Sequence, residues 1–134
     1  MNNEIILHFT TSLASGGTER TIYNLISKSK NYNHVVVSLT SGGDYIDKLR
    51  EINVKVYTIN LQKNILDVFK VFYIIKILFI VKPAIIHCWT YHANLIAGFL
   101  SKIFFYKNII WSVRTSNFKN IDVKLTTKII INIL

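Results

Sequence analysis

The run Ser15-Gly16-Gly17-Thr18 is the first place in the chain where the residues suggest chemistry. It follows an apolar stretch, Ile5 to Phe9, and opens a segment with helical spacing. Adjacent glycines let a ligand approach the backbone closely, and free N–H groups at a helix start favour anions. The run lacks both the G-x-G-x-x-G fingerprint and the Gly-Lys-Ser/Thr of a P-loop. It predicts either a phosphate or diphosphate site, or a plain turn in which Ser15 or Thr18 caps the helix.

A second suggestive segment runs from His87 to Asn94 and contains two histidines. His87 and Cys88 end an apolar strand pattern, so we expect both in the core. His92 lies beyond the strand, where its imidazole could hydrogen-bond a sugar hydroxyl or a phosphate, or transfer a proton. The two histidines have no carboxylate partner nearby, which makes a metal site a poor fit, and we expect no metal.

The third segment, Trp111 to Asn117, places Arg114 at the end of another apolar strand pattern. A guanidinium in that position suits a phosphate or a carboxylate, and the alternative is an ordinary surface arginine. No pair of carboxylates, nucleophile elbow or Cys–His arrangement accompanies these segments.

The elements that must position these segments alternate along the chain. Apolar patterns predict strands over 5–9, 35–39, 54–59, 84–88 and 109–113. Helical spacing predicts helices over 18–30, 45–52, 65–82, 93–106 and from 122 onward. Such alternation predicts one α/β domain over 1–134, a Rossmann-like parallel sheet with helices on both faces. Ligands bind such sheets at the carboxyl ends of the strands, which is where all three segments fall.

The predicted helix over 65–82 is apolar almost all round. Asp67, Lys70 and Lys76 interrupt it, and a membrane span needs ~20 mostly apolar residues, so we do not predict a transmembrane helix. We expect the helix to be buried against the sheet, as helices of parallel α/β domains are. The alternative is contact with a lipid surface, with the lysines near the headgroups.

Composition and charge narrow the choice of partners. The single cysteine and the absence of a secretory signal pattern predict a cytoplasmic location, with possible peripheral contact at the inner membrane face. Of the net charge of +9, residues 1–67 carry +1 and residues 68–134 carry +8. This asymmetry favours an anionic partner such as a phosphate-bearing substrate or an anionic membrane. The alternative is a basic surface that only contacts water. We expect no nucleic acid, because aromatic residues are not interleaved with the basic ones.

Three motifs in order resemble glycosyltransferase family 4. Gly16-Gly17-Thr18-Glu19-Arg20 is similar to the family's G-G-x-E-R motif, and Pro83 to Gly98 resembles its segment around W-x-Y-H-A-D/N-L. Ile110 to Asn117 is similar to its W-x-hydrophobic-R-N-S strand end. The chain departs from the family at Ala84, where aspartate is usual, and at Thr115 to Asn117, which replaces Asn-Ser.

The resemblance implies a GT-B fold, in which two Rossmann-like domains enclose the active site. Members move a sugar from a nucleotide-sugar donor to an acceptor with retention of configuration, usually without a metal or other cofactor. This chain resembles the N-terminal, acceptor-binding domain. The family's C-terminal Arg/Lys pair and E-x7-E segment have no counterpart, and the pattern ends inside a helix, so we expect a missing C-terminal donor-binding domain.

The resemblance also implies roles for individual residues. Gly16 and Gly17 would approach the donor diphosphate, and His92 would be the catalytic residue. The residues implied on the acceptor side are Thr18, Glu19, Arg20, Trp89, Tyr91, Arg114 and Asn117.

The function that we expect is the acceptor-binding half of a retaining glycosyltransferase, inactive alone. Its substrates would be a nucleotide sugar and a glycan or lipid-linked acceptor of cell-surface polysaccharide synthesis. The alternative is a non-catalytic partner or membrane-docking subunit of a split glycosyltransferase. A nucleotide-binding or response-regulator domain is disfavoured, because it would need the longer glycine fingerprint or an acidic phosphorylation pocket.

Overall fold

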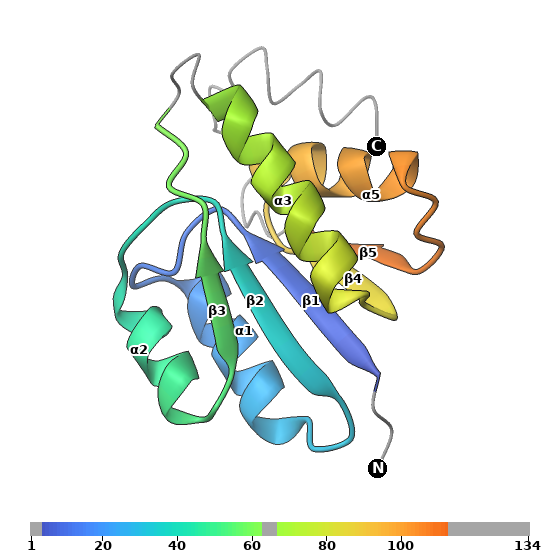
Figure 1. The fold of residues 1–134 in the computed structure, drawn as a ribbon. Helices are drawn as coiled ribbons and strands as arrows, with labels where there is room; N and C mark the ends of the chain where they lie inside the picture. Colours follow the sequence, from blue (N-terminus) through green and yellow to red (C-terminus); the bar gives the residue numbers. More distant parts are fainter. Residues whose placement is uncertain (1–3, 63–66, 113–134) are drawn as a thin grey trace, which may run out of the picture.

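The computed structural model describes residues 4–62 and 67–112, which form a five-stranded parallel sheet in the order β3-β2-β1-β4-β5 (Figure 1). The strands, in chain order, are β1 (Ile5–Thr10), β2 (Asn33–Ser38), β3 (Lys55–Thr58), β4 (Ile85–Cys88) and β5 (Ile109–Trp111). This is a Rossmann-like α/β architecture, as predicted.

Helices cover both faces of the sheet. On one face lie α1 (Gly17–Lys28) and α2 (Asp44–Glu51). On the other lie α3 (Asp67–Val81) and a continuous helical segment (Figure 1). That segment consists of α4 (Tyr91–Ala93), one π-helical turn (Asn94–Gly98) and α5 (Phe99–Ile103).

Two cores form because side chains alternate across each strand. On β1, Leu7 and Phe9 are fully buried in the core that Ile74 and Ile77 of α3 help to form. The core beneath α1 and α2 contains Ile22, Ile26, Val36, Leu49 and Trp89. Burying each large aliphatic or aromatic side chain contributes roughly 1.5–3 kcal/mol, so these two layers fix the sheet that carries the site.

The predicted elements within the described residues are present, with shifted ends. β2 begins at Asn33, two residues earlier than predicted, because Asn33 pairs with Ile5 at the start of β1. The helix predicted from Ala93 begins instead at Tyr91. Val113 and the helix predicted from Asp122 lie outside the described residues.

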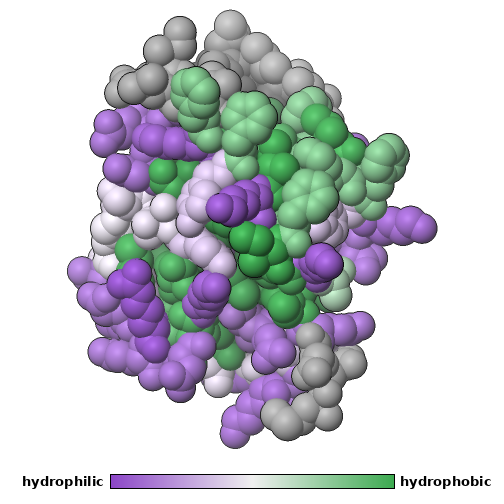
Figure 2. Space-filling model, in the orientation of Figure 1, coloured by the Kyte–Doolittle hydropathy of each residue, from purple (hydrophilic) through white to green (hydrophobic). Residues whose placement is uncertain are grey.

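The expected burial of α3 is wrong for half of the helix. Ile74, Ile77, Leu78 and Val81 pack against the sheet. The opposite side of the helix is also apolar but is exposed, and it forms hydrophobic surface in Figure 2. A single helix layer can bury only the side that faces the sheet, and the apolar composition of the other side therefore needs its own explanation.

α3, the long apolar helix, contains 15 residues, which is shorter than a bilayer span. Within residues 4–62 and 67–112, no helix is long and apolar enough to cross a membrane.

Candidate functional site

The candidate site lies where the strand order reverses. β1 and β4 are neighbours, and the chain leaves β1 toward α1 on one face but leaves β4 toward α4 on the other (Figure 1). The two loops diverge at this point, and ligands of open α/β sheets bind in the crevice that such divergence creates. Of the predicted site residues, Gly16 to Arg20 follow β1, and Trp89 to His92 follow β4.

The glycine pair forms an exposed helix start without a side-chain cap. Gly16 is the N-cap of α1 in an extended conformation, and the first backbone bond of the helix runs from Arg20 N to Gly16 O at 3.1 Å. Neither Ser15 nor Thr18 caps the helix, so the plain-turn alternative is wrong in that respect. The Ser15 hydroxyl donates instead to Asp44 Oδ2 at 2.6 Å. The N–H groups of the first turn thus have no intrahelical partner and remain suited to an anion.

Glu19 folds back over the start of its own helix. Its Oε1 accepts a hydrogen bond from the Ser12 hydroxyl at 3.2 Å, and its carboxylate lies beside Gly16, where a methyl group would collide with Oε2. A carboxylate in the first turn interacts favourably with the helix dipole. Glu19 therefore stabilises the helix start on the side of the site.

The neighbouring loop holds the glycine loop in place. Gly43 has a φ of 125°, and a Cβ there would collide with the backbone of Leu13 and Ala14. Tyr45 N donates to Leu13 O at 3.1 Å. Only glycine fits this close approach of two backbones, which explains Gly43, the second of the two glycines after β2.

Two threonines join the loops after β1 and β4, on either side of the place where the strand order reverses, which we call the switch point. The hydroxyl oxygens of Thr11 and Thr90 are 2.6 Å apart, and Thr11 N donates to Thr90 Oγ1 at 3.2 Å. Thr90 is also the N-cap of α4. This pair joins the β1 end of the glycine loop to the start of the segment that carries His92.

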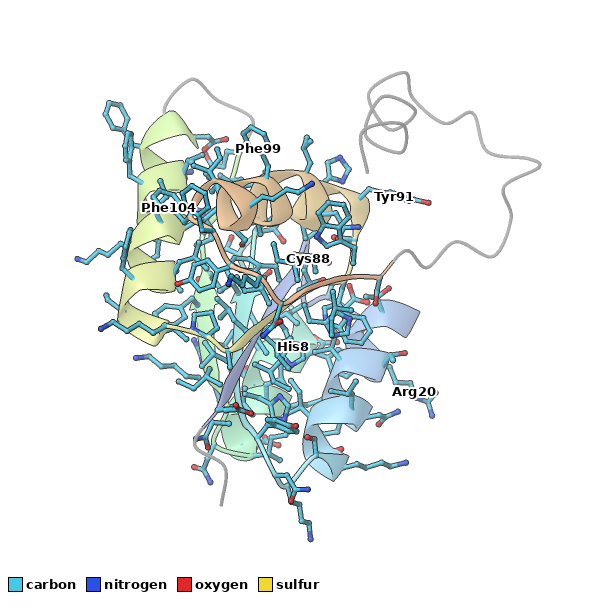
Figure 3. All side chains as sticks on the ribbon, turned by 90° about the vertical axis from the view of Figure 1, so that its right-hand side faces the viewer. His8, Arg20, Cys88, Tyr91, Phe99 and Phe104 are labelled. Carbon is cyan, nitrogen blue, oxygen red and sulfur yellow. The ribbon has the colours of Figure 1, made fainter. Side chains whose placement is uncertain are left out.

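The residues after β4 differ in their access to solvent. Trp89 is only 4% exposed, and its Nε1 donates to His8 Nδ1 at 3.1 Å, so its side chain belongs to the core beneath the site. Tyr91 is half-buried and His92 is exposed. Figure 3 shows Tyr91 and Arg20 projecting from the same side of the molecule. The accessible side chains of this segment are thus those of Tyr91 and His92.

His87 and Cys88 lie in the core, as predicted. Burial lowers the pKa of His87 to about 4 and raises that of the Cys88 thiol to about 12. The His87 ring stacks on Trp89 with centroids 4.0 Å apart, and its Nε2 lies 2.7 Å from Ser112 Oγ. No group of three or more metal-binding side chains occurs within residues 4–62 and 67–112.

Asn94, one turn into the helical segment, is a residue for which the sequence predicts no role. It is buried at the start of the π-helical turn, and neither polar atom of its side-chain amide has a hydrogen-bond partner within the described part of the chain. π-helical turns and unpaired buried amides both occur preferentially at functional sites. Asn94 therefore holds an unpaired donor and acceptor inside the helical segment, two residues after His92.

Arg114 and Asn117 lie outside the described residues, and their roles remain predictions. The strand that precedes them, β5, pairs with β4 in parallel, with Trp111 opposite Cys88.

Thr11 and Asn94 were missed for different reasons. The role of Thr11 depends on its contact with Thr90, which lies 79 residues away, and nothing local in the sequence links the two. Asn94 stands within the motif segment, but its burial without a partner is a property of packing. A threonine at the second position after each of two strand patterns, 5–9 and 84–88, is the signal that could have suggested the pair.

The fold is a Rossmann-like α/β sheet that resembles one half of a GT-B fold. The structure is similar to that of Acinetobacter baumannii MurG, a GT-B glycosyltransferase, with a TM-score of 0.61 and 11% sequence identity. The similarity covers 84% of this chain and 36% of the MurG chain, and at this identity it concerns the fold. No family model and no curated protein matches the sequence.

Proposed function

We propose that this chain is the acceptor-binding half of a retaining glycosyltransferase of the family 4 type. It would help to move a sugar from a nucleotide-sugar donor to a lipid-linked glycan in cell-surface polysaccharide synthesis. The observation that carries the proposal is the pairing of two loops at the β1/β4 switch point. One loop offers an uncapped, exposed glycine helix start, the other offers exposed His92, and Thr11 and Thr90 hold them together.

The glycine loop would stabilise the leaving group. In the transfer, the bond between the anomeric carbon and a diphosphate oxygen breaks, and that oxygen keeps the electron pair. Gly16 and Gly17 are exposed, so diphosphate oxygens can reach the backbone N–H groups that begin α1. Hydrogen bonds and the helix dipole at this end favour the developing negative charge.

The segment after β4 would serve the acceptor. Exposed His92 hydrogen-bonds the acceptor hydroxyl and takes up the proton that this hydroxyl loses as it attacks the anomeric carbon. The attack comes from the face that the diphosphate leaves, so the configuration is retained. Tyr91, and Thr18, Glu19 and Arg20 across the switch point, line the acceptor side. Trp89 supports this wall from beneath, because its side chain is buried.

A second Rossmann-like domain would hold the nucleotide of the donor. The chain spans 36% of MurG, which leaves room in a GT-B enzyme for such a domain. We expect the donor-binding domain to be a separate unit on which turnover depends, and we expect no metal.

A transfer assay with radiolabelled nucleotide sugars tests this proposal. The purified chain alone should show no transfer, and the longer protein or subunit pair that carries the donor-binding domain should be active. In that active form, His92→Ala should lower turnover by about 10²-fold or more, the range for loss of a positioned acid or base. The free energy of unfolding should change by less than about 0.5 kcal/mol, as for other exposed positions.

Glu51→Ala, at the far end of α2, is the matched control and should leave turnover unchanged. Turnover by the chain alone would contradict the need for a second domain. Unchanged turnover in His92→Ala would assign this residue a structural role instead.

A further inference from the structure

His8 is an unexpected residue for the centre of a parallel sheet. It lies in β1 opposite Val36 of β2 and His87 of β4, and it is fully buried in the interior of the molecule (Figure 3). A buried imidazole costs free energy unless its nitrogens are hydrogen-bonded, whereas a valine or a leucine would fill this position without that cost. The hydrogen bonds that His8 makes therefore have to explain its presence in the core.

One of these hydrogen bonds holds the indole of Trp89. Trp89 Nε1 donates to His8 Nδ1 at 3.1 Å, between side chains that are 4% and 0% exposed. An indole N–H can only donate, and a buried donor that loses its acceptor is strongly unfavourable. The ring of His87 stacks on the same indole with centroids 4.0 Å apart. The indole is thus held at its edge by β1 and on its face by β4.

Trp89 lies at the base of both loops of the candidate site. Its backbone N donates to Phe9 O of β1 at 2.9 Å. Its indole belongs to the core that also contains Leu13, in the loop after β1. Thr90, the N-cap of α4, follows Trp89 directly, and His92 is two residues further on. The orientation of the indole therefore bears on both loops.

We propose that His8 is a positioning residue, whose Nδ1 holds the Trp89 indole in the orientation that places Thr90 and His92 at the switch point. Without this acceptor the indole N–H would turn toward water or toward another acceptor, and the backbone that follows Trp89 would move with it. The effect on sugar transfer rests on the proposed function, in which His92 takes up the proton of the acceptor hydroxyl. The positioning itself does not depend on that function.

Two substitutions of nearly equal shape separate positioning from space filling. His8→Asn keeps an oxygen at the same number of bonds from Cβ as Nδ1, whereas His8→Leu puts a methyl group there. Leucine would be the better replacement for a residue that only fills the core, because burial favours apolar side chains. Asparagine is the better replacement for a residue that holds the indole. Both variants lose the imidazole ring, so its direct influence on neighbouring signals is removed equally in the two.

Nuclear magnetic resonance of the ¹⁵N-labelled full chain measures the outcome. In His8→Leu the indole proton of Trp89 should move upfield, as expected for a lost hydrogen bond, and the backbone amide signals of Thr90 and His92 should shift. His8→Asn should restore most of both changes. Trp89→Phe removes the donor instead of the acceptor and should shift the same two amide signals, so it tests the proposal even if His8→Leu does not fold. Adding His8→Leu to Trp89→Phe should cause little further shift, as expected for two residues that act through one contact.

Ile26→Val is the matched control. It removes a methyl group from the same core near the end of α1 without removing a hydrogen bond. It should lower the free energy of unfolding while the Trp89 indole and the amides of Thr90 and His92 keep their chemical shifts. The proposal is overturned if leucine at position 8 preserves these signals as well as asparagine does. It is also overturned if Trp89→Phe leaves the two amide signals in place.

Turnover of the form that carries the donor-binding domain connects the positioning to sugar transfer. His8→Leu should lower kcat about tenfold or more with little change in the KM for the nucleotide sugar, because a displaced proton acceptor affects the reaction step rather than donor binding. His8→Asn should recover most of this loss. If the His92 signal shifts while kcat stays the same, the positioning is supported and the proposed role of His92 in transfer is contradicted. If the His92 signal does not shift, the positioning is overturned whatever the turnover.

Discussion

Gly17 and Gly43 are glycines for different reasons. A Cβ on Gly17 would meet no atom within 4 Å, so the fold leaves the position open. Gly43 has a φ of 125° and lies directly against the Leu13 backbone, so the fold requires glycine there. Any reason for glycine at position 17 therefore lies outside the described fold, and a closely approaching ligand is such a reason.

Replacing each glycine by alanine separates these roles. Gly17→Ala should change the free energy of unfolding by less than about 1 kcal/mol, whereas Gly43→Ala should lower it by about 1–3 kcal/mol because the left-handed conformation is strained. Urea unfolding measures both. In the form that carries the donor-binding domain, Gly17→Ala should weaken nucleotide-sugar binding by about tenfold, equivalent to about 1.4 kcal/mol. Donor binding that is unaffected by Gly17→Ala would contradict the close approach.

Trp89, His8 and His34 form a directional chain of hydrogen bonds. Trp89 Nε1 can only donate, so His8 Nδ1 must accept and the proton of the neutral His8 ring sits on Nε2. That Nε2 lies 3.0 Å from His34 Nδ1 and donates to it. The indole thereby sets the tautomer of both rings.

At the scale of elements, the Thr11–Thr90 pair is the connection on which the site geometry rests. It joins the loop after β1 to the N-cap of α4, and both partners are part-buried. The hydroxyl pair links the first residue after β1 to the last residue before α4, a connection that strand pairing alone does not provide.

Thr90→Val tests the connection at constant size. Valine leaves Thr11 N and Oγ1 without their partner, which should lower the free energy of unfolding by about 1–3 kcal/mol. Thr90→Ser keeps the hydroxyl and should restore most of the loss. Both values come from urea unfolding followed by circular dichroism. Equal stability of the valine and serine variants would show that the pair does not hold the loops.

The sequence predicts where helices and strands occur better than it predicts which of their side chains are exposed. The alternation of strand and helix patterns correctly predicts the parallel sheet, because apolar residues recur at the spacing of the buried side of each element. The pattern failed for α3, where apolar residues on all sides cannot show that Phe72 faces outward while Ile74 faces the sheet. The π-helical turn after Ala93 has no periodicity signal either, since it depends on local packing.

That the two candidate loops lie side by side was predictable, whereas the contacts of their side chains were not. The rule that ligands bind at carboxyl strand ends selected the loops at Gly16 and His92 from order alone. It could not show that Trp89 points into the core while Tyr91 remains partly accessible. Side-chain direction after a strand depends on which face the next helix covers, and a single sequence does not specify that.

For the whole molecule, the buried histidines predict loss of stability in acid. Burial, with the neighbouring rings of His87 and His34, lowers the pKa of His8 from 6.5 to about 3. Below pH 6.5 His8 binds a proton in the unfolded chain, whereas in the folded chain it stays neutral down to about pH 3. The free energy of unfolding therefore falls as the pH decreases through this window. At pH 5 the loss from His8 is about 2 kcal/mol. His87 acts in the same direction, since burial lowers its pKa to about 4.

Urea unfolding at pH 7.5 and pH 5.0 measures this loss. His8→Gln keeps an acceptor for the Trp89 indole but cannot titrate, so its stability should depend less on pH than that of the wild type. A wild-type unfolding free energy that is the same at both pH values would show that the imidazoles do not resist protonation in the folded chain.

Cys88 gives the molecule a practical property. It is the single cysteine of the chain, it is fully buried, and burial raises the pKa of its thiol to about 12. Since thiolates are the reactive form, alkylating dyes should leave the folded native protein unlabelled. A cysteine introduced at Phe105, which is 90% exposed, would then be the only position to take up a fluorophore. The protein thus accepts a single reporter group without removal of its own thiol.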